Sequence, residues 1–542
     1  MEIKDILQLL IFLALIIGLA PLLGKFMFSV FSDGKHFLKP VLGGFENRIY
    51  GFLKINPGKE MDWKEYLFSI LIFNFIGFIF LMLILMFQKF LPLNPQGFDN
   101  IPFHLAFNIA VSFVSNTNWQ SYAGETTLSY LSQMLGLTVQ NFLSAATGIA
   151  VLLAIARGLK NRQSSRLGNF YGDLVRSVIY ILIPLSVLLA AALISQGVIQ
   201  DFSGYKTITT LEGTEQIIPS GPAASQIAIK QLGTNGGGFF NTNSSHPFEN
   251  PTPLSNFLQM ISILLIPASL TFTYGHIVGS KNQGTVLFAA MMILFCAGLF
   301  TSLYSEFSFG IGNNISAMEG KETRFGILNS VIWSTATTAA SNGSVNAMHS
   351  SLTPLSGLVA MLNMMLGEII FGGVGSGMYG MLIFVIITVF ISGLMVGRTP
   401  EYLGKKIESP EIKMAILAIL LPSAVILIFT AAALINDIAL SSLSAAGPHG
   451  FSEILYAFSS AAGNNGSAFA GLNANTVFYN IMIAIGMLIG RFGVIVPVLV
   501  IAGNLSGKNI SPESAGTFKT DNFLFVVLLC FVIAIIGGLT FF

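Results

Sequence analysis

Apolar stretches recur along the whole chain, and polar, glycine-rich connections separate them. Because a helix needs about 20 apolar residues to cross the hydrocarbon core of a bilayer, each stretch predicts one membrane-spanning helix. The pattern predicts ten spans, at residues 6–23, 66–91, 137–156, 177–194, 254–277, 286–303, 358–396, 414–434, 477–501 and 523–541. Glu2 and Asp5 precede the first stretch and no small-x-small cleavage site follows it, so we expect a retained helix rather than a signal peptide.

The composition agrees with an integral membrane protein. Hydrophobic residues make up 53% of the 542 residues and charged residues only 9%, whereas soluble domains carry about 25% charged residues. A net charge of +1 excludes a strongly basic nucleic-acid binder. Cys296 and Cys530 both lie in apolar stretches, so no disulfide framework is expected.

The distribution of Lys and Arg predicts the orientation, because these residues resist translocation. The connections after spans 1, 3, 5, 7 and 9 hold 19 of the 26 Lys and Arg residues, and the opposite side holds six. The remaining one, Arg491, lies within a span. We therefore expect the odd-numbered connections to face inward and both termini to face outward.

Four of the outward connections contain a related tetrad shortly before the next span. The tetrads are Asn116-Thr117-Asn118-Trp119, Gly233-Thr234-Asn235-Gly236, Ala340-Ser341-Asn342-Gly343 and Gly463-Asn464-Asn465-Gly466. Aligned on the third residue, they lie 117, 107 and 123 residues apart, and Trp119 then stands where the others have glycine. Four copies at a similar spacing on one side of the membrane predict a fourfold repeat of span, loop and span.

Segments of intermediate hydrophobicity precede the tetrads, at residues 104–114, 223–232, 327–339 and 453–462. Their length predicts short helices that enter the membrane and stop, which requires a water-filled cavity or surrounding protein. A short helix followed by such a loop can place backbone carbonyls around an axis, where they replace the hydration shell of a monovalent cation. The candidate filter residues are Asn116, Thr117, Asn118, Thr234, Asn235, Gly236, Ser341, Asn342, Gly343, Asn464, Asn465 and Gly466. Ordinary surface turns are the alternative, but they explain neither the repeat nor the common side.

Two charged residues lie within predicted spans, where charge is costly. Glu368 is followed by a glycine-rich stretch that includes Gly372 and Gly373, and Arg491 interrupts the ninth span. The seventh span is long enough for two half-helices joined by that stretch, which could obstruct the ion path below the filter. We interpret Glu368 and Arg491 as guards of this path. The alternative is a Glu–Arg pair between repeats, or an arginine that reaches the lipid headgroups.

Two histidines and two carboxylates lie near the tetrads. No Cys or further His accompanies His246 or His349, so we expect structural hydrogen bonds rather than a metal site. We expect Glu125 and Glu249 at the outer mouth, where they could raise the local cation concentration. The alternative is that both are solvated loop charges.

The tetrads and their surroundings resemble the KdpA family, the potassium-binding subunits of bacterial Kdp potassium-transporting ATPases. The matching segments are residues 116–125 (NTNWQSYAGE), 233–253 (GTNGGGFFNTNSSHPFENPTP), 345–349 (VNAMH) and 463–472 (GNNGSAFAGL). The resemblance implies that potassium is the ion and that Gln120 shapes the filter. It also implies a bacterial inner-membrane location and an all-α fold of about ten transmembrane helices with four membrane–pore–membrane repeats. The corresponding units are residues 66–176, 177–285, 286–413 and 414–521, flanked by an N-terminal helix and loop (1–65) and a C-terminal helix (522–542).

The chain contains neither a Gly-x-x-x-x-Gly-Lys-Ser/Thr phosphate loop nor an Asp-Lys-Thr-Gly phosphorylation motif. The longest inward connection, residues 24–65, is too short for a nucleotide-binding domain. We therefore expect no catalytic site and no bound ATP here. The resemblance implies three partners: a P-type ATPase catalytic subunit (KdpB-like), a single-helix accessory subunit (KdpC-like) and a small membrane peptide (KdpF-like). The alternatives are a channel or secondary potassium transporter without an ATPase, and a membrane enzyme, for which no nucleophile–base–acid set is present.

Overall fold

The computed structural model describes residues 2–32, 34–309, 318–367, 369–395, 397–511 and 518–541. The prediction of an all-α membrane protein with ten spans is confirmed, because ten helices in these ranges are long and apolar enough to cross a bilayer. They are α1 (Ile3–Phe31), α3 (Trp63–Met86), α6 (Val139–Lys160) with the π-helical turn η2 (Ser132–Thr138), α7–η3–α8 (Phe170–Arg176, Ser177–Leu182 and Ile183–Ser195), α10 (Pro253–Ile277), α11 (Lys281–Phe309), α14 (Ser376–Met395), α15 (Ser409–Leu434), α18 (Val477–Ser506) and α19 (Phe523–Phe541).

A short helix lies between the two spans of each repeat, as the sequence predicts. These helices are α4 (Phe103–Val114), α9 (Ala223–Leu232), α12 (Gly326–Ala339) and α17 (Gly447–Gly463). Three of them begin within one residue of the predicted start. Helix α17 begins six residues early, because Pro448 in its first turn fits the helix N-terminus.

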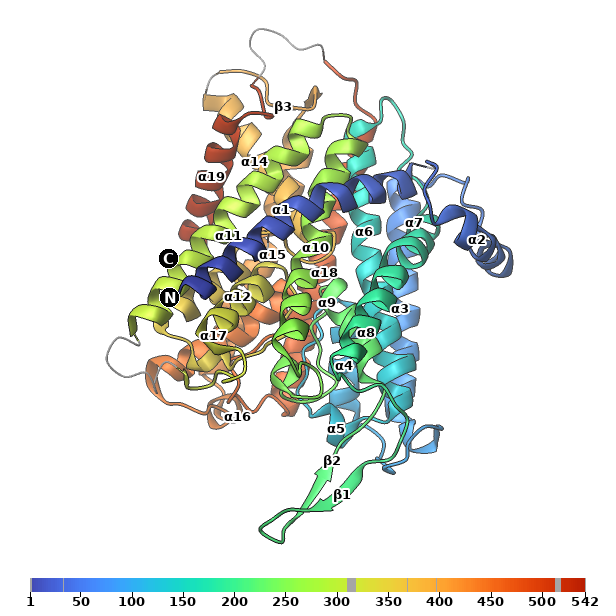
Figure 1. Ribbon diagram of the computed structural model, residues 1–542. Helices are drawn as coiled ribbons and strands as arrows, with labels where there is room; N and C mark the ends of the chain where they lie inside the picture. Colours follow the sequence, from blue (N-terminus) through green and yellow to red (C-terminus); the bar gives the residue numbers. More distant parts are fainter. Residues whose placement is uncertain are drawn as a thin grey trace.

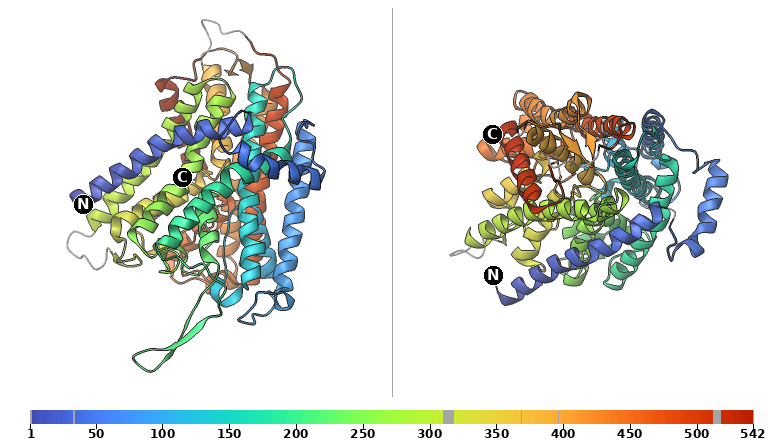
Figure 2. Two further views of the ribbon diagram at one scale, coloured as in Figure 1. Left: turned by 45° about the vertical axis from the view of Figure 1, so that its right-hand side comes forward. Right: turned by 90° about the horizontal axis from the view of Figure 1, so that it is seen from above.

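The two spans of each repeat differ in their surroundings. In the spans that follow the short helices (those of α6, α10, α14 and α18), 56–83% of the most apolar window is buried, against 22–50% for the preceding spans (those of α3, α7–α8, α11 and α15). The first group therefore forms an inner ring and the second group the outer surface. Helices α1 and α19 pack outside this arrangement, with α1 running obliquely across α10 (Figures 1 and 2). Gly24 permits this contact, since a Cβ there would lie 2.6 Å from the Ser269 carbonyl oxygen.

The seventh predicted span is broken, as its glycine content indicates. Helix α13 (Pro354–Met365) ends before α14 begins, and the backbone N–H groups of Gly372 and Val374 between them donate to Ala339 and Thr234 near the tetrad loops. Gly367, Gly372 and Gly375 have φ values of 78°, 62° and 87°, a left-handed conformation that glycine adopts without a Cβ clash.

The two ends of the bundle differ in charge. We call the end that holds the odd-numbered connections, with 19 of the 26 Lys and Arg residues, the basic end. It lies at the top of Figure 1 and carries the hairpin of β3 (Glu401–Tyr402) and β4 (Lys405–Lys406). The opposite end, the loop end, carries the hairpin of β1 (Lys206–Thr209) and β2 (Glu215–Ile218), which projects from the bundle.

The connections hold further helices that the sequence pattern does not predict. The longest is α2 (Lys39–Leu53), which lies at the edge of the bundle near the basic end (Figure 2). The shorter ones are η1 (Gln88–Phe90), α5 (Gly124–Thr127), η4 (Asn243–Ser245), η6 (His349–Ser351) and α16 (Asp437–Ser441).

Candidate cation filter

Each of the four tetrad loops leaves the C-terminal end of a short helix and makes the same turn. In each loop one backbone N–H donates a hydrogen bond to the carbonyl oxygen five residues earlier, at 2.9–3.0 Å. The donors are Thr117, Asn235, Asn342 and Asn465, and the acceptors are Ser112, Lys230, Thr337 and Ser460. This shared bond makes the four donors structurally equivalent.

The residues on both sides of each donor have a left-handed backbone. The pairs are Asn116 with Asn118, Thr234 with Gly236, Ser341 with Gly343, and Asn464 with Gly466. The predicted alignment was therefore wrong by one residue in the first loop: Thr117, not Asn118, matches the asparagines of the other loops. Asn118 rather than Trp119 takes the place of the glycines, which its φ of 55° allows because asparagine tolerates this conformation.

The four loops follow one another around a ring. In three loops, the glycine after the donor residue faces the carbonyl oxygen of the donor residue in the next loop so closely that a Cβ would overlap it. These pairs are Gly236 with Asn342, Gly343 with Asn465, and Gly466 with Thr117. The first loop meets the second through Asn118, whose amide lies against Gly237.

Polar side chains connect each loop to its neighbours. Their bonds are Asn116 Nδ2 to the Thr234 carbonyl (2.9 Å), Asn342 Nδ2 to the Lys230 carbonyl (3.0 Å), Ser341 Oγ to the Asn464 carbonyl (2.9 Å), Asn465 Nδ2 to the Thr337 carbonyl (2.9 Å) and Asn464 Nδ2 to Thr117 Oγ1 (3.0 Å). These bonds cover all four junctions, so the ring is closed.

Four equivalent carbonyl groups keep their acceptor capacity. They belong to Thr117, Asn235, Asn342 and Asn465, which are fully buried. Within the described part of the chain, none of these oxygens accepts a hydrogen bond. Buried carbonyls are nearly always paired, so four unpaired ones in equivalent places indicate a site for a cation.

The four short helices add a favourable electrostatic contribution. Helices α4, α9, α12 and α17 all end at the ring with their C-termini, where the helix dipole places partial negative charge. The ring therefore attracts a cation without a carboxylate in its inner layer.

Gln120 connects the first and second loops outside the ring. Its Nε2 donates to the Gly238 carbonyl at 2.9 Å, and its Oε1 accepts from the Gly238 N–H at 2.8 Å. The Asn118 amide, in contrast, is 3% exposed and both of its polar atoms are unpaired. A polar side chain without a protein partner thus faces Gly237 where the other loops have only glycine.

A buried ion pair that the sequence pattern did not predict supports the second loop. Lys230 and Glu249 are both fully buried and in direct contact. Lys230 Nζ also donates to Asn243 Oδ1 at 2.8 Å, and Asn243 Nδ2 donates to the Gly236 carbonyl at 2.7 Å. The expectation of Glu249 as a charge at the outer mouth is wrong, because its carboxylate neutralises Lys230 behind the filter loop.

Glu125 is half-buried at the loop end and accepts a hydrogen bond from the Asn241 N–H at 2.9 Å, which joins the outer parts of the first two repeats. Burial raises the pKa of this carboxyl group. His246 stacks on Phe240, and His349 is hydrogen-bonded to Tyr456 at 2.8 Å. The described residues contain no cluster of His, Cys, Asp and Glu that could hold a metal ion.

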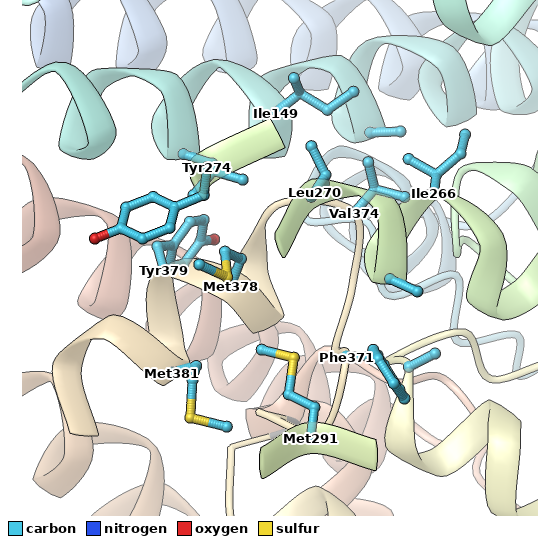
Figure 3. Packing of buried hydrophobic residues seen from close by; sticks show 14 of the residues in the cluster. Ile149, Ile266, Leu270, Tyr274, Met291, Phe371, Val374, Met378, Tyr379 and Met381 are labelled. Carbon is cyan, nitrogen blue, oxygen red and sulfur yellow. The ribbon is translucent and has the colours of Figure 1, made fainter. Parts of the chain in front are cut away.

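The segment between α13 and α14 passes directly beneath the ring. The Gly372 N–H donates to the Ala339 carbonyl at 3.0 Å, and the Val374 N–H donates to Thr234 Oγ1 at 2.9 Å. A Cβ on Gly373 would lie 3.4 Å from that of Ser341. Figure 3 shows Phe371 and Val374 of this segment among apolar side chains of α6, α10, α11 and α14. Glu368, the other predicted guard, lies outside the described residues.

Arg491 lies below the ring on α18. It is 4% exposed, and its Nη2 donates to the Ser144 carbonyl on α6 at 3.0 Å. It lines a cavity of about 80 Å³ together with Asn464, Ser376 and Tyr379. The guanidinium therefore places a positive charge next to the space under the filter.

These features define a class: polytopic membrane proteins with four membrane–pore–membrane repeats around a central carbonyl ring. A solved structure of this general fold, the potassium transporter TrkH from Vibrio parahaemolyticus, superposes with a TM-score of 0.52 at 14% identity, over 91% of this chain and 97% of that one. The chain belongs to the KdpA family, whose model, described as the potassium-transporting ATPase A subunit, matches residues 10–542.

Relatives of high identity carry the same description. A potassium-transporting ATPase potassium-binding subunit from Leptospira interrogans is 57% identical over 538 residues, which covers 99% of this chain and 95% of the relative. The protein of that name from Pseudomonas aeruginosa is 52% identical over 547 residues, with 100% and 97% coverage.

Proposed function

We propose that this chain binds potassium ions from outside the cell in the carbonyl ring and passes them inward as the ion-selective subunit of an ATP-driven uptake complex. The four buried, unpaired carbonyls of Thr117, Asn235, Asn342 and Asn465 carry the proposal. Backbone carbonyls in a ring can replace the hydration shell of potassium. The names of the family and its relatives support potassium as the ion.

In each loop, the central residue supplies the candidate ligand, and the residues on both sides of it support the turn. The residues before and after each central carbonyl hold the left-handed turns. The side chains that bind neighbouring loops are those of Asn116, Ser341, Asn342, Asn464 and Asn465. Gln120 fixes the junction of the first two loops. This support keeps the carbonyls at the spacing that a potassium ion fills, so the whole set of candidate filter residues contributes to selectivity.

Control of the ion path lies below the ring. The segment with Gly372 and Gly373 crosses beneath it, and Arg491 adds a positive charge that opposes a free flow of cations. We assign Glu368 to the same region on its sequence position between α13 and α14. Movement of this segment would open the path during transport.

ATP hydrolysis requires a partner, because the chain has neither a phosphate loop nor a phosphorylation motif. We propose assembly with a P-type ATPase catalytic subunit, a single-helix accessory subunit and a small membrane peptide in the bacterial plasma membrane. The basic end then faces the cytoplasm and both termini face outward, in accordance with the distribution of Lys and Arg. We propose the units 66–176, 177–285, 286–413 and 414–521 as the four repeats; the first span of each begins three to seven residues earlier, at Trp63, Phe170, Lys281 and Ser409.

A transporter or channel that needs no ATPase is the second candidate, because the fold is shared with TrkH. Rubidium uptake in cells without their own potassium systems separates the two. We expect uptake only when the chain is expressed with its ATPase partners, and we expect vanadate to abolish it. Uptake by the chain alone would favour the second candidate.

A further inference from the structure

Helix α2 packs against the bundle through a side that holds a buried carboxylate. Glu46 on this helix is 6% exposed and accepts hydrogen bonds from Tyr180 Oη at 2.6 Å, Tyr50 Oη at 2.9 Å and Arg176 Nε at 3.1 Å. Tyr180 and Arg176 belong to the fourth span. The contact that holds α2 in place combines these polar bonds with Leu42 and Ile49, which pack partly buried against the core.

The opposite side of α2 is apolar and exposed. Val41, Phe45 and Phe52 are 75%, 51% and 86% exposed, and Phe37 just before the helix is 74% exposed. Their spacing of four and seven residues puts them on one face of a helix. A surface helix in water keeps its large apolar side chains off the exposed side, so this exposed face requires an apolar surrounding.

The segment around α2 is also strongly basic. Between residues 34 and 59 it contains five Lys and Arg residues, all exposed: Lys35, Lys39, Arg48, Lys54 and Lys59. The one carboxylate in this stretch is Glu46, which is paired with Arg176. Glu60 is exposed beside Lys59 just outside this stretch, so basic side chains still outnumber exposed carboxylates around the apolar face.

The contacts with the fourth span set the depth of α2. That span, Phe170–Ser195, has 26 residues, and at 1.5 Å per residue its length of about 39 Å exceeds the hydrocarbon core by about 9 Å. Arg176 and Tyr180 lie about 9 Å and 15 Å from the start of the span at the basic end. With the excess length at that end, Glu46 lies level with the boundary between headgroups and acyl chains.

We propose that α2 is an interfacial helix that binds the anionic lipid leaflet at the basic end. Its aromatic face enters the acyl layer and its Lys and Arg residues contact lipid phosphates. Interfacial helices of this composition lie about 5–10 Å deep in the boundary region, and basic residues near the membrane surface favour anionic lipids. The inference rests on the geometry of α2 and is independent of the proposed transport function.

Spin labels test the environment of the apolar face directly. We would introduce Phe45→Cys or Phe52→Cys into the full chain carrying Cys296→Ala and Cys530→Ala, with Asn47→Cys on the flank as the matched control. The labelled chain would be reconstituted, alone and with its co-expressed partners, into phosphatidylcholine vesicles with and without phosphatidylglycerol. The readouts are the collision rates of each label with oxygen, which concentrates in lipid, and with a water-soluble nickel chelate.

We expect labels at positions 45 and 52 to be accessible to oxygen and shielded from nickel, and the label at position 47 to show the reverse. Nickel access at 45 and 52 would place the face in water and overturn the proposal. Low access to both agents in the assembled complex would identify a protein partner as the occupant and would also overturn it.

The anionic preference has its own test. We expect labels at positions 45 and 52 to lie deeper in vesicles that contain phosphatidylglycerol, and the triple substitution Lys39→Gln, Arg48→Gln and Lys54→Gln to abolish this difference. The Glu46 contacts stay intact in that variant, so α2 remains docked. An identical depth in both lipid mixtures for the unsubstituted chain would refute the role of anionic headgroups.

Discussion

The buried pair of Lys230 and Glu249 gives a sharp test of the filter. Glu249→Gln leaves the ammonium of Lys230 without its counter-charge. Lys230 Nζ is joined to the Gly236 carbonyl by two hydrogen bonds through the Asn243 amide, of 2.8 Å and 2.7 Å. The uncompensated charge therefore lies close to the candidate ion site.

The magnitude follows from this geometry. Two hydrogen bonds and one amide group span at most about 8 Å, and we take about 9 Å as the distance from Nζ to an ion in the ring. Two unit charges about 9 Å apart at an effective dielectric constant of about 20 interact with about 2 kcal/mol. We therefore expect Glu249→Gln to weaken potassium binding roughly 20-fold. Breaking a buried pair also lowers the free energy of unfolding, by about 3–5 kcal/mol.

Removal of the positive charge instead of the negative one tests the direction of the effect on potassium binding. Lys230→Met leaves a lone carboxylate behind the loop, so we expect tighter binding of potassium and weaker discrimination against ammonium. The double variant Lys230→Met with Glu249→Leu removes both charges, and its affinity should return toward the starting value. Potassium titrations of the purified chain by calorimetry measure all three, with size-exclusion chromatography as the check of folding.

The direction of the affinity change in the two single variants distinguishes an electrostatic role of the pair from a mechanical one. A purely mechanical role of the pair predicts that both single variants weaken binding, since either change disturbs the hydrogen bonds to Asn243. Two losses of similar size would therefore refute the proposed effect of charge on the ion. Opposite shifts in the two folded variants would support it.

Four further outcomes are expected. Gly466→Ala would overlap the Thr117 carbonyl, so potassium affinity should fall at least about tenfold while competition by rubidium increases in binding assays. Asn118→Gly should keep the melting temperature, whereas Asn118→Val should lower stability by about 1–2 kcal/mol, because a β-branched residue is strained at positive φ. Arg491→Ala should allow rubidium to leak through vesicles that hold the assembled complex without ATP. Burial opposes ionisation of Glu46, but hydrogen bonds from Tyr180, Arg176 and Tyr50 outweigh it and lower its pKa. The docking of α2 should therefore hold above the ordinary carboxyl pKa and weaken as the pH falls through the lowered pKa. Hydrogen exchange of the α2 amides measures this loss of docking.

The spans and the short helices could be predicted because length and apolarity decide them. Helices α4, α9 and α12 begin within one residue of their predicted starts. The break in the seventh span was predicted from its glycine content and its length. These features depend on residues that are close together in the sequence, so the sequence alone is enough to predict them.

The register of the first filter loop could not be read from residue types. Asn116 and Asn118 both offer an asparagine to the alignment, and only the hydrogen bond from the Thr117 N–H to Ser112 and the two positive φ values select the correct one. The pairing of Lys230 with Glu249 was missed because 19 residues separate them and charges near polar loops are usually solvated. Helix α2 was missed because it is too short for a span and carries apolar side chains on both its docked and its exposed side.

The four loops of the ring share one backbone conformation, but different side chains support each of them. Gln120 binds Gly238 in the first, the Lys230–Glu249 pair stands behind the second, and the Trp333 indole donates to the Ser344 carbonyl in the third at 2.9 Å. In the fourth, the Tyr456 hydroxyl contacts Ser467 Oγ at 2.9 Å. Because the proposed ligands are backbone oxygens, side chains need only hold each turn rigid, and several kinds of side-chain contact achieve this. Selectivity then depends on the stiffness of the whole ring, so weakening any one support should affect discrimination between ions before it affects folding.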